Sequence, residues 1–311
     1  MRVKARAYAS SANLGPGFDA LALAVDAFYD EVTVETSPKP GVELVSVEGP
    51  YSGGVDIARN TATASIKELL RITGMNGEGL RVTLWKGVPP GRGLGSSGAS
   101  AAAAVKAAAT LLGLDAPLET LVRAAGLGEA ASSGSPHYDN VAASLLGGLA
   151  VVGEQDGSIV VAGIEARPHI VLGIPFNEVP PNKTREMRRV LPDTVGFKAY
   201  VHNTQRLALL LAGFAMGDYR LAGLGMDDRI VEPRRKQFVP CYEELRQAAY
   251  RAGAAGFTIS GAGPSVIALA ETPGSAELIA RAMKEAYTSC GTPFLVVPAR
   301  GALGATVLQV I

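Results

Sequence analysis

The segment VPPGRGLGSSGAS, residues 88–100, joins a strand predicted at 80–85 to an alanine-rich helix predicted at 97–112. Glycines let a backbone approach a phosphate closely, and the N-terminus of the helix adds partial positive charge. The segment therefore indicates a phosphate-binding loop that opens a helix. It is neither a Walker A loop, since no Gly-Lys-Ser/Thr follows, nor a dinucleotide fingerprint with an acidic partner downstream.

Taken alone, this segment is equally compatible with a glycine turn and a serine N-cap. Two further segments rich in small residues change the balance: FTISGAGPS at 257–265 and ASSANLGPGFDAL at 9–21. The first lies between two predicted strands and has more small residues than a hairpin needs, which favours close approach to a ligand or another loop. The second lies on a predicted loop, where an Asx turn ending in a helix cap at Asp19 would explain it by itself.

The bulk composition is that of a globular protein. The chain has 311 residues, enough for two modest domains, and 48% of them are hydrophobic. Basic and acidic residues number 29 each, and this zero formal net charge disfavours nucleic acid and anionic membranes as partners. No apolar signal core is present near the N-terminus, so we expect a cytoplasmic protein. Cys241 and Cys290 lack the paired spacing of a zinc site and are expected to be buried fillers rather than a disulfide framework.

The periodicity of apolar residues predicts alternating strands and helices along the chain. The predicted strands are 3–9, 31–36, 42–47, 80–85, 149–154, 159–161, 170–174, 256–260, 266–270 and 294–297. The predicted helices are 60–73, 97–112, 117–127, 138–146, one that ends at 190, 196–216, 242–252 and 275–289. A junction at 162–168 separates the two parts, and the second part approaches a βαββαβ split-sheet order.

The three glycine-rich segments, in this order and at these distances, resemble the signature motifs of the GHMP kinases, which include galactokinase, homoserine kinase and mevalonate kinase. SSANLGPGFD at 10–19 is similar to the homoserine kinase form of the first motif, whereas mevalonate and galactose kinases carry Gly-Glu-His there. The match spans nearly the whole chain. It implies an α+β, two-domain GHMP kinase fold. Residues 1–162 would form an ATP-binding domain like domain 2 of ribosomal protein S5, and residues 163–311 a ferredoxin-like βαββαβ domain.

The same resemblance implies a nucleotide site. Adenine would lie near Asn60 and Lys86, and the polyphosphate on the glycine-rich loop. The expected ATP-binding residues are Asn60, Lys86, Pro89, Pro90, Gly91, Arg92, Gly93, Leu94, Gly95, Ser96, Ser97, Gly98 and Ala99. Gly98 departs from the family, which usually has alanine after the serine pair, and this weakens helix propensity slightly. Mg²⁺ would be held by Ser97 and Glu129.

The implied reaction is phosphorylation of the side-chain hydroxyl of L-homoserine, a step of threonine biosynthesis. Arginines can bind the substrate carboxylate bidentately, and Asp19 can pair with the ammonium. The expected substrate-binding residues are Asn13, Asp19, His137, Asn140, Thr184, Arg188, Arg235 and Gly261. Catalysis, which in phosphoryl transfer depends mainly on alignment and charge neutralisation, is expected from Asn140, Asp19, Arg188 and Ser97.

Alternatives remain at this stage. Each arginine could form a surface ion pair, and Glu129 could be a solvated charge. No general base is assigned, because Asn140 stands where mevalonate-type relatives use an aspartate and Asp139 can point elsewhere. The rival functions are a GHMP kinase for shikimate, mevalonate or a sugar, and a non-catalytic nucleotide sensor. The family's habits suggest a homodimer.

Overall fold

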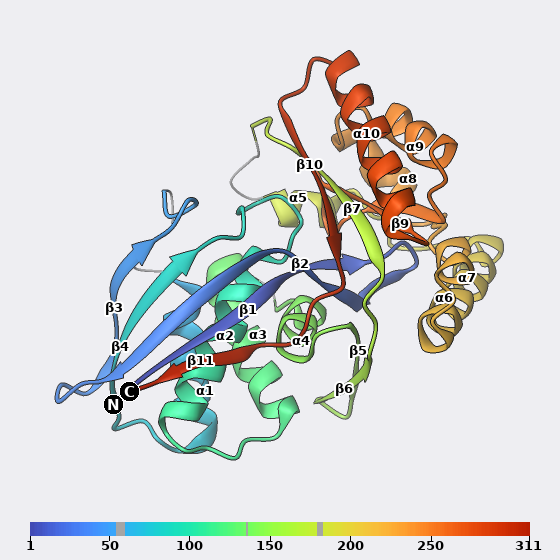
Figure 1. The fold of residues 1–311 in the computed structure, drawn as a ribbon. Coiled ribbons are helices and arrows are strands. Elements are labelled where there is room, and N and C mark those ends of the chain that lie inside the picture. Colours follow the sequence, from blue (N-terminus) through green and yellow to red (C-terminus); the bar gives the residue numbers. More distant parts are fainter. Residues whose placement is uncertain (54–59, 135, 179–182) are drawn as a thin grey trace.

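The computed structural model describes residues 1–53, 60–134, 136–178 and 183–311, without the side chains of 131–133 and 184. The described residues form two β-sheets, each packed against helices (Figure 1). None of the helices found in these ranges is both long and apolar enough to cross a membrane. The predicted α+β class is confirmed.

The larger sheet has seven strands, and its centre is a long N-terminal hairpin. Its strands are β1 (Arg2–Asn13), β2 (Gly17–Thr36), β3 (Gly41–Glu48), β4 (Gly79–Lys86), β5 (Leu149–Gln155), β6 (Ser158–Ile164) and β11 (Thr306–Val310). The main path runs β11-β1-β2-β4-β3, and β5 pairs with the first part of β2 and carries β6. Only the β3–β4 pair is parallel among these described strands. On β1, Val3, Ala5 and Ala7 are fully buried, which agrees with the predicted alternation.

Four helices pack against this sheet and share one hydrophobic core with it. They are α1 (Thr61–Thr73), α2 (Ser96–Leu111), α3 (Leu118–Ser133) and α4 (Tyr138–Leu146). The central helix is α2, which contacts β1, β2, α1, α3 and α4. Its alanines are small enough to let all of these elements approach closely, as expected from the sequence.

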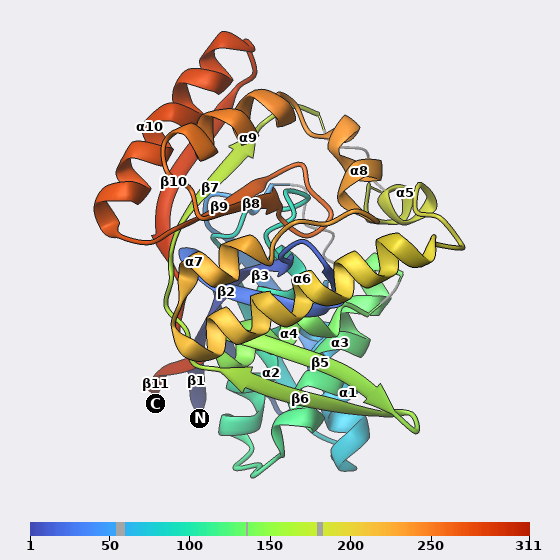
Figure 2. The same cartoon turned by 90° about the vertical axis from the view of Figure 1, so that its right-hand side faces the viewer.

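The smaller sheet has the antiparallel order β10-β7-β9-β8. Its strands are β7 (His169–Pro175), β8 (Gly256–Ile259), β9 (Val266–Ala270) and β10 (Phe294–Arg300). The accompanying helices are α5 (Lys183–Arg189), α6 (Phe197–Met216), α7 (Tyr219–Leu224), α8 (Glu232–Arg235), the short 3-10 helix η1 (Lys236–Phe238), α9 (Tyr242–Arg251) and α10 (Pro273–Ser289) (Figure 2). The first and third strands are adjacent at the centre, so the ferredoxin-like βαββαβ prediction is confirmed.

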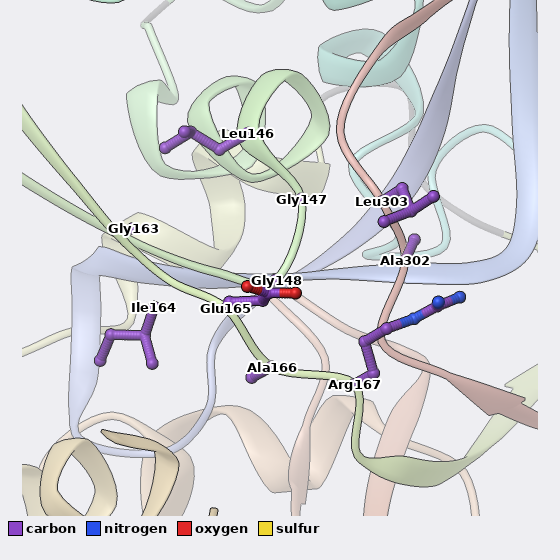
Figure 3. A pocket seen from close by; sticks show the side chains of 10 residues that line it. All are labelled: Leu146, Gly147, Gly148, Gly163, Ile164, Glu165, Ala166, Arg167, Ala302 and Leu303. Carbon is purple, nitrogen blue, oxygen red and sulfur yellow. The ribbon is translucent and has the colours of Figure 1, made fainter. Parts of the chain in front are cut away.

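Two short connections cross between the sheets and lie side by side. The first leads from β6 to β7 and the second from β10 to β11, and the amide of Gly301 donates to the carbonyl of Pro168 at 3.0 Å. A cavity of about 290 Å³ lies at this crossing, bordered by Glu165 and Arg167 of the first connection and Leu303 of the second (Figure 3). The predicted domain boundary at residue 162 stays a prediction, because β11, which follows it in the sequence, belongs to the first sheet.

Two features differ from the sequence interpretation. The segment at 9–21 is the tip of the β1–β2 hairpin rather than a loop with a helix cap, and Asp19 lies within β2 at a φ of 56°. The cysteines are not buried fillers: Cys241 is half-buried, Cys290 is exposed, and the two form a disulfide with Cα atoms 6.3 Å apart. The bond joins the start of α9 to the end of α10, and the sequence does not indicate this pairing because the two cysteines are 49 positions apart.

We predict that this disulfide stabilises the protein. Closing a loop of 49 residues restricts the unfolded chain, and the chain-entropy model gives about 4 kcal/mol for that length. A Cys241→Ser, Cys290→Ser double variant should therefore lose roughly 2–4 kcal/mol of unfolding free energy in urea titrations. Reductant should lower the stability of the natural protein to the same level and leave the double variant unchanged. Equal stability of all four samples would contradict the prediction.

Candidate active site

Three segments that are far apart in the sequence meet between the two sheets. The Ser260 hydroxyl, just after β8, donates to the carbonyl of Gly93 at 2.7 Å and lies 2.9 Å from the Ser11 hydroxyl of β1. The amide of Gly261 donates to the carbonyl of Ala12 at 3.1 Å. The structure thus brings together the three glycine-rich segments that the sequence singled out.

The middle segment is a loop between β4 and α2 that only glycine can form at two positions. A Cβ on Gly93 would lie 2.3 Å from the carbonyl oxygen of Ser260, and one on Gly95 would lie 2.1 Å from the Ser10 hydroxyl. Both glycines have positive φ, and Gly95 is the N-cap of α2. The loop therefore packs its backbone against Ser260 and Ser10, and it ends at the N-terminus of a 16-residue helix, where an anion is stabilised.

A buried ion pair holds the base of this loop. The Lys86 ammonium, at the end of β4, pairs with Asp30 of β2 and donates to the Ser96 carbonyl at 2.7 Å and the Ser100 hydroxyl at 2.9 Å. The second oxygen of Asp30 accepts from the amides of Gly87 and Val88, both at 2.9 Å. The predicted nucleotide residue Lys86 thus has its ammonium engaged beneath the loop.

A hydroxyl and a carboxylate meet at the first turn of α2. The Ser97 hydroxyl donates to Glu129 of α3 at 2.5 Å, and Nδ1 of His137 lies 3.4 Å from the same carboxylate oxygen. Burial alone would lower the pKa of His137, but the hydrogen bond and charge of Glu129, with Asp139, raise it above its ordinary value. Within the described ranges no group of three or more acidic, histidine or cysteine side chains gathers to hold a metal. One carboxylate beside one hydroxyl nevertheless suits Mg²⁺, which usually takes its remaining ligands from water and phosphate.

The amide of Asn140, at the start of α4, lies next to these groups. Its Oδ1 accepts from the Ser10 hydroxyl at 2.9 Å, and its backbone amide donates to Asp139 at 2.8 Å. Asp139 is almost fully buried, and burial is the main reason that its pKa is raised to about 6, with a contribution from Asp19. The Asp139 carboxylate contacts the backbone of the first turn of its own helix, α4, through the Asn140 amide.

The charged residues predicted to bind substrate gather around Phe18. Asp19 pairs with Arg188 of α5 at 2.7 Å, and both side chains are more than 40% exposed. Arg235 of α8 is buried and donates to the Gly261 carbonyl at 3.2 Å; its guanidinium lies 5.1 Å from the Phe18 ring centre, and that of Arg188 lies 5.5 Å from it. Asn13 links two parts of the cluster, because it donates to Gly261 and accepts from the amide of Asp19.

The remaining predicted residues have mixed placements. The Asn60 side chain caps α1 by accepting from Ala62 at 2.9 Å. The Arg92 guanidinium turns toward β7 and donates to the carbonyls of Pro175 and Asn177, both at 2.8 Å. Leu94 and Ala99 bury their side chains in the core, the hydroxyl of Ser96 donates to Val88, and the side chain of Thr184 lies outside the described residues.

Comparison with known proteins identifies the family. Models described as the GHMP kinases N terminal domain and GHMP kinases C terminal match residues 60–148 and 208–289. The homoserine kinase of Aeropyrum pernix is 51% identical over 311 residues, which cover 99% of this chain and 98% of that protein. The chain belongs to the homoserine kinase family of GHMP kinases. A homoserine kinase of Pyrobaculum aerophilum is 44% identical over 92% of this chain and 94% of that protein. A crystal structure of homoserine kinase from Cytophaga hutchinsonii superimposes with a TM-score of 0.90 at 35% identity. The match covers 99% of this chain and 97% of that chain.

Membership in this family confirms that the protein is an enzyme, a kinase with the two-part GHMP fold. The sequence interpretation had not singled out three residues that lie beside the predicted site residues: Asp30, Phe18 and Lys183. Phe18 lies inside the segment SSANLGPGFD, quoted above for its neighbours, and Lys183 directly precedes the predicted substrate residue Thr184. The only sequence signal for Asp30 is weak: it is a carboxylate within a strand that otherwise alternates between apolar and polar residues.

A buried carboxylate holds the helix that carries Arg235 in the kinase. Glu232, at the start of α8, accepts from the hydroxyls of Tyr242 and Thr258 and from the amide of Ile259. Asp228 accepts from the amides of Val231 and Glu232. Burial raises the pKa of Glu232 to about 7 even though its hydrogen bonds oppose this.

We predict that the buried pair beneath the loop dominates the local stability of the kinase. Asp30→Asn leaves the Lys86 ammonium buried without its counter-charge and should cost roughly 3–5 kcal/mol of unfolding free energy. Glu35→Gln on the same strand breaks an exposed pair with Arg2 and should cost at most about 1 kcal/mol. The Asp30→Leu, Lys86→Met double variant removes both charges, so it should lose less unfolding free energy than the sum of the losses of its two single variants. Equal small losses for Asp30→Asn and Glu35→Gln in urea unfolding would contradict this.

We also predict a pH dependence from Glu232. Because its pKa is raised in the folded kinase, its contribution is complete below the unfolded pKa of 4.5 and is lost as the pH rises through about 7. Between pH 4.5 and 8 the natural protein should therefore lose up to roughly 3 kcal/mol relative to Glu232→Gln, which does not titrate. Urea unfolding of both proteins at pH 4.5, 6 and 8 measures this difference, and a constant difference would refute the assignment.

Proposed function

We propose that this enzyme transfers the γ-phosphoryl group of ATP to the side-chain hydroxyl of L-homoserine, forming O-phospho-L-homoserine. The observation that supports this best is the Asp19–Arg188 ion pair at the rim of the glycine-rich loops, with Arg235 behind it. The relative from Aeropyrum pernix is named a homoserine kinase and matches almost end to end.

The charge arrangement is complementary to an amino acid. A zwitterion carries one positive and one negative group, and the Asp19–Arg188 pair offers the opposite of each. Because this pair is exposed, its own attraction is worth at most about 1 kcal/mol, so a substrate can separate it at little cost. Arg235 then adds a second guanidinium for the carboxylate, held toward Phe18 by a cation–π contact.

The phosphoryl group would transfer beside the loop, where positioning and charge neutralisation supply most of the catalysis. The loop amides and the start of α2 would hold the polyphosphate, and Ser97 with Glu129 would hold Mg²⁺. The bound ion would neutralise charge that develops on the phosphate oxygens. His137, hydrogen-bonded to Glu129, would keep that carboxylate aligned.

The hydroxyl proton has no committed acceptor in this proposal. Asn140 carries an amide, which cannot take up a proton, and Asp139 accepts from the Asn140 amide within its own turn. We infer that the proton passes to the phosphate as the new bond forms, while Asn140 orients the hydroxyl. A cytoplasmic location and a homodimer remain predictions from the sequence.

A coupled assay for ADP release tests the proposal with homoserine, shikimate, mevalonate, threonine and galactose offered in turn. We expect turnover with homoserine alone. Turnover with another alcohol instead would replace the substrate, and binding of ATP without any turnover would favour the sensor.

Asp19→Asn sharpens the same assay. Loss of the carboxylate should raise KM for homoserine by about 10- to 100-fold, since charge-assisted hydrogen bonds are worth roughly 1.5–3 kcal/mol. KM for ATP should stay within about threefold. Asp156→Asn is the matched control, because Asp156 also has a positive φ, of 52°, and lies in the β5–β6 turn. An unchanged KM for homoserine in Asp19→Asn would make an amino-acid substrate untenable.

A further inference from the structure

The side chain of Lys183 lies between two of the glycine-rich loops. Lys183 is the first residue of α5, and its ammonium donates to the carbonyl of Gly91 at 3.0 Å and to that of Gly263. Gly91 belongs to the loop before α2, and Gly263 to the loop between β8 and β9. The ammonium therefore stands where the backbones of both loops converge.

This ammonium lacks a counter-charge. Across 1–53, 60–134, 136–178 and 183–311, no carboxylate forms an ion pair with Lys183. The charged groups that act on it are two guanidiniums, Arg235 and Arg92, and burial together with their repulsion lowers the pKa of Lys183 to about 7. Three cations held near one another, of which Arg235 alone is acted on by carboxylates, those of Asp19 and Asp228, form a site that favours a polyanion.

The other cations near the loop already have partners. Lys86 is bound to Asp30 beneath the loop, and Arg92 donates to two carbonyls at the end of β7. Arg188 is paired with Asp19. Lys183, like Arg92, is held only by neutral carbonyls, but those of Lys183 belong to two of the glycine-rich loops. A phosphate oxygen can replace them with a stronger, charge-assisted hydrogen bond.

We propose that Lys183 binds the terminal phosphoryl group of the nucleotide, leaving the Gly91 and Gly263 carbonyls when that group enters. This inference rests on the proposed ATP-dependent function and adds to it a residue that distinguishes ATP from ADP. On binding, the ammonium gains a counter-charge, and the repulsion among the three cations is relieved. The same contact stabilises charge on the phosphoryl group during transfer, so Lys183 is a catalytic residue of the site.

The test compares Lys183→Met with the natural enzyme in two measurements, calorimetric binding of ATP and ADP and steady-state turnover. Loss of the ammonium should weaken ATP binding about 10-fold or more and lower kcat by about 10-fold or more, while ADP binding stays within about threefold. Lys183→Arg, which keeps the charge, should recover part of both losses. Lys284→Met is the matched control, since Lys284 is exposed on α10, and it should behave like the natural enzyme.

The outcomes separate this inference from the function on which it rests. If Lys183→Met weakens ATP and ADP binding equally, the lysine only fastens the two loops, and the inference is wrong. Unchanged ATP binding and kcat would also overturn it. If the natural enzyme neither binds ATP nor turns over any alcohol, the proposed function itself fails. Thermal unfolding of each variant checks that a lost activity does not reflect a lost fold.

Discussion

The buried pair between Asp30 and Lys86 is the constraint on which the rest of the site depends. Desolvating two charges costs several kcal/mol per ion, so such a pair persists only where its remaining hydrogen-bonding capacity is filled. Here the Gly87 and Val88 amides and the Ser96 carbonyl fill it. These groups mark the two ends of the glycine-rich loop. One interaction thus joins the start of the loop, the start of α2 and the central strand.

The loop is also fixed from the side of the second sheet. The Ser260 hydroxyl donates to the Gly93 carbonyl, and the Gly261 amide donates to the Ala12 carbonyl. The Ser260 carbonyl oxygen lies too close to Gly93 to admit a Cβ there. Neither sheet alone can therefore form the site. Close approach also occurs beside the crossing of the two connections between the sheets, where a Cβ on Gly304 would lie 2.3 Å from the Leu145 carbonyl oxygen. Small residues at the crossing and at the site both allow segments of the chain to approach one another closely.

Local patterns predicted most elements and all three glycine-rich segments, because period-two strands, an alanine-rich helix and glycine-rich turns are encoded by near neighbours in the sequence. Features that depend on contacts between residues far apart in the sequence were not predicted. The last strand, TVLQV, has little local signature and is defined by its partner β1. The Cys241–Cys290 bond depends on the packing of α9 against α10. The pairing of Lys86 with Asp30 was also not predicted, because the two residues are 56 positions apart, while the nucleotide contact of Lys86 stays a prediction.

The cationic groups of the site differ in how firmly they are held, and this difference sorts their functions. Lys86 is buried with a carboxylate, so releasing it would leave an unpaired charge, and its ammonium supports the loop. Arg188 is exposed and paired with Asp19, so an amino acid can exchange with each partner at little cost. Lys183 is bound by carbonyls without a carboxylate, so an incoming anion improves its environment. Under the proposed function, the partner of each cation therefore accounts for its role: Lys86 supports the loop, Arg188 binds the amino acid and Lys183 binds the phosphate.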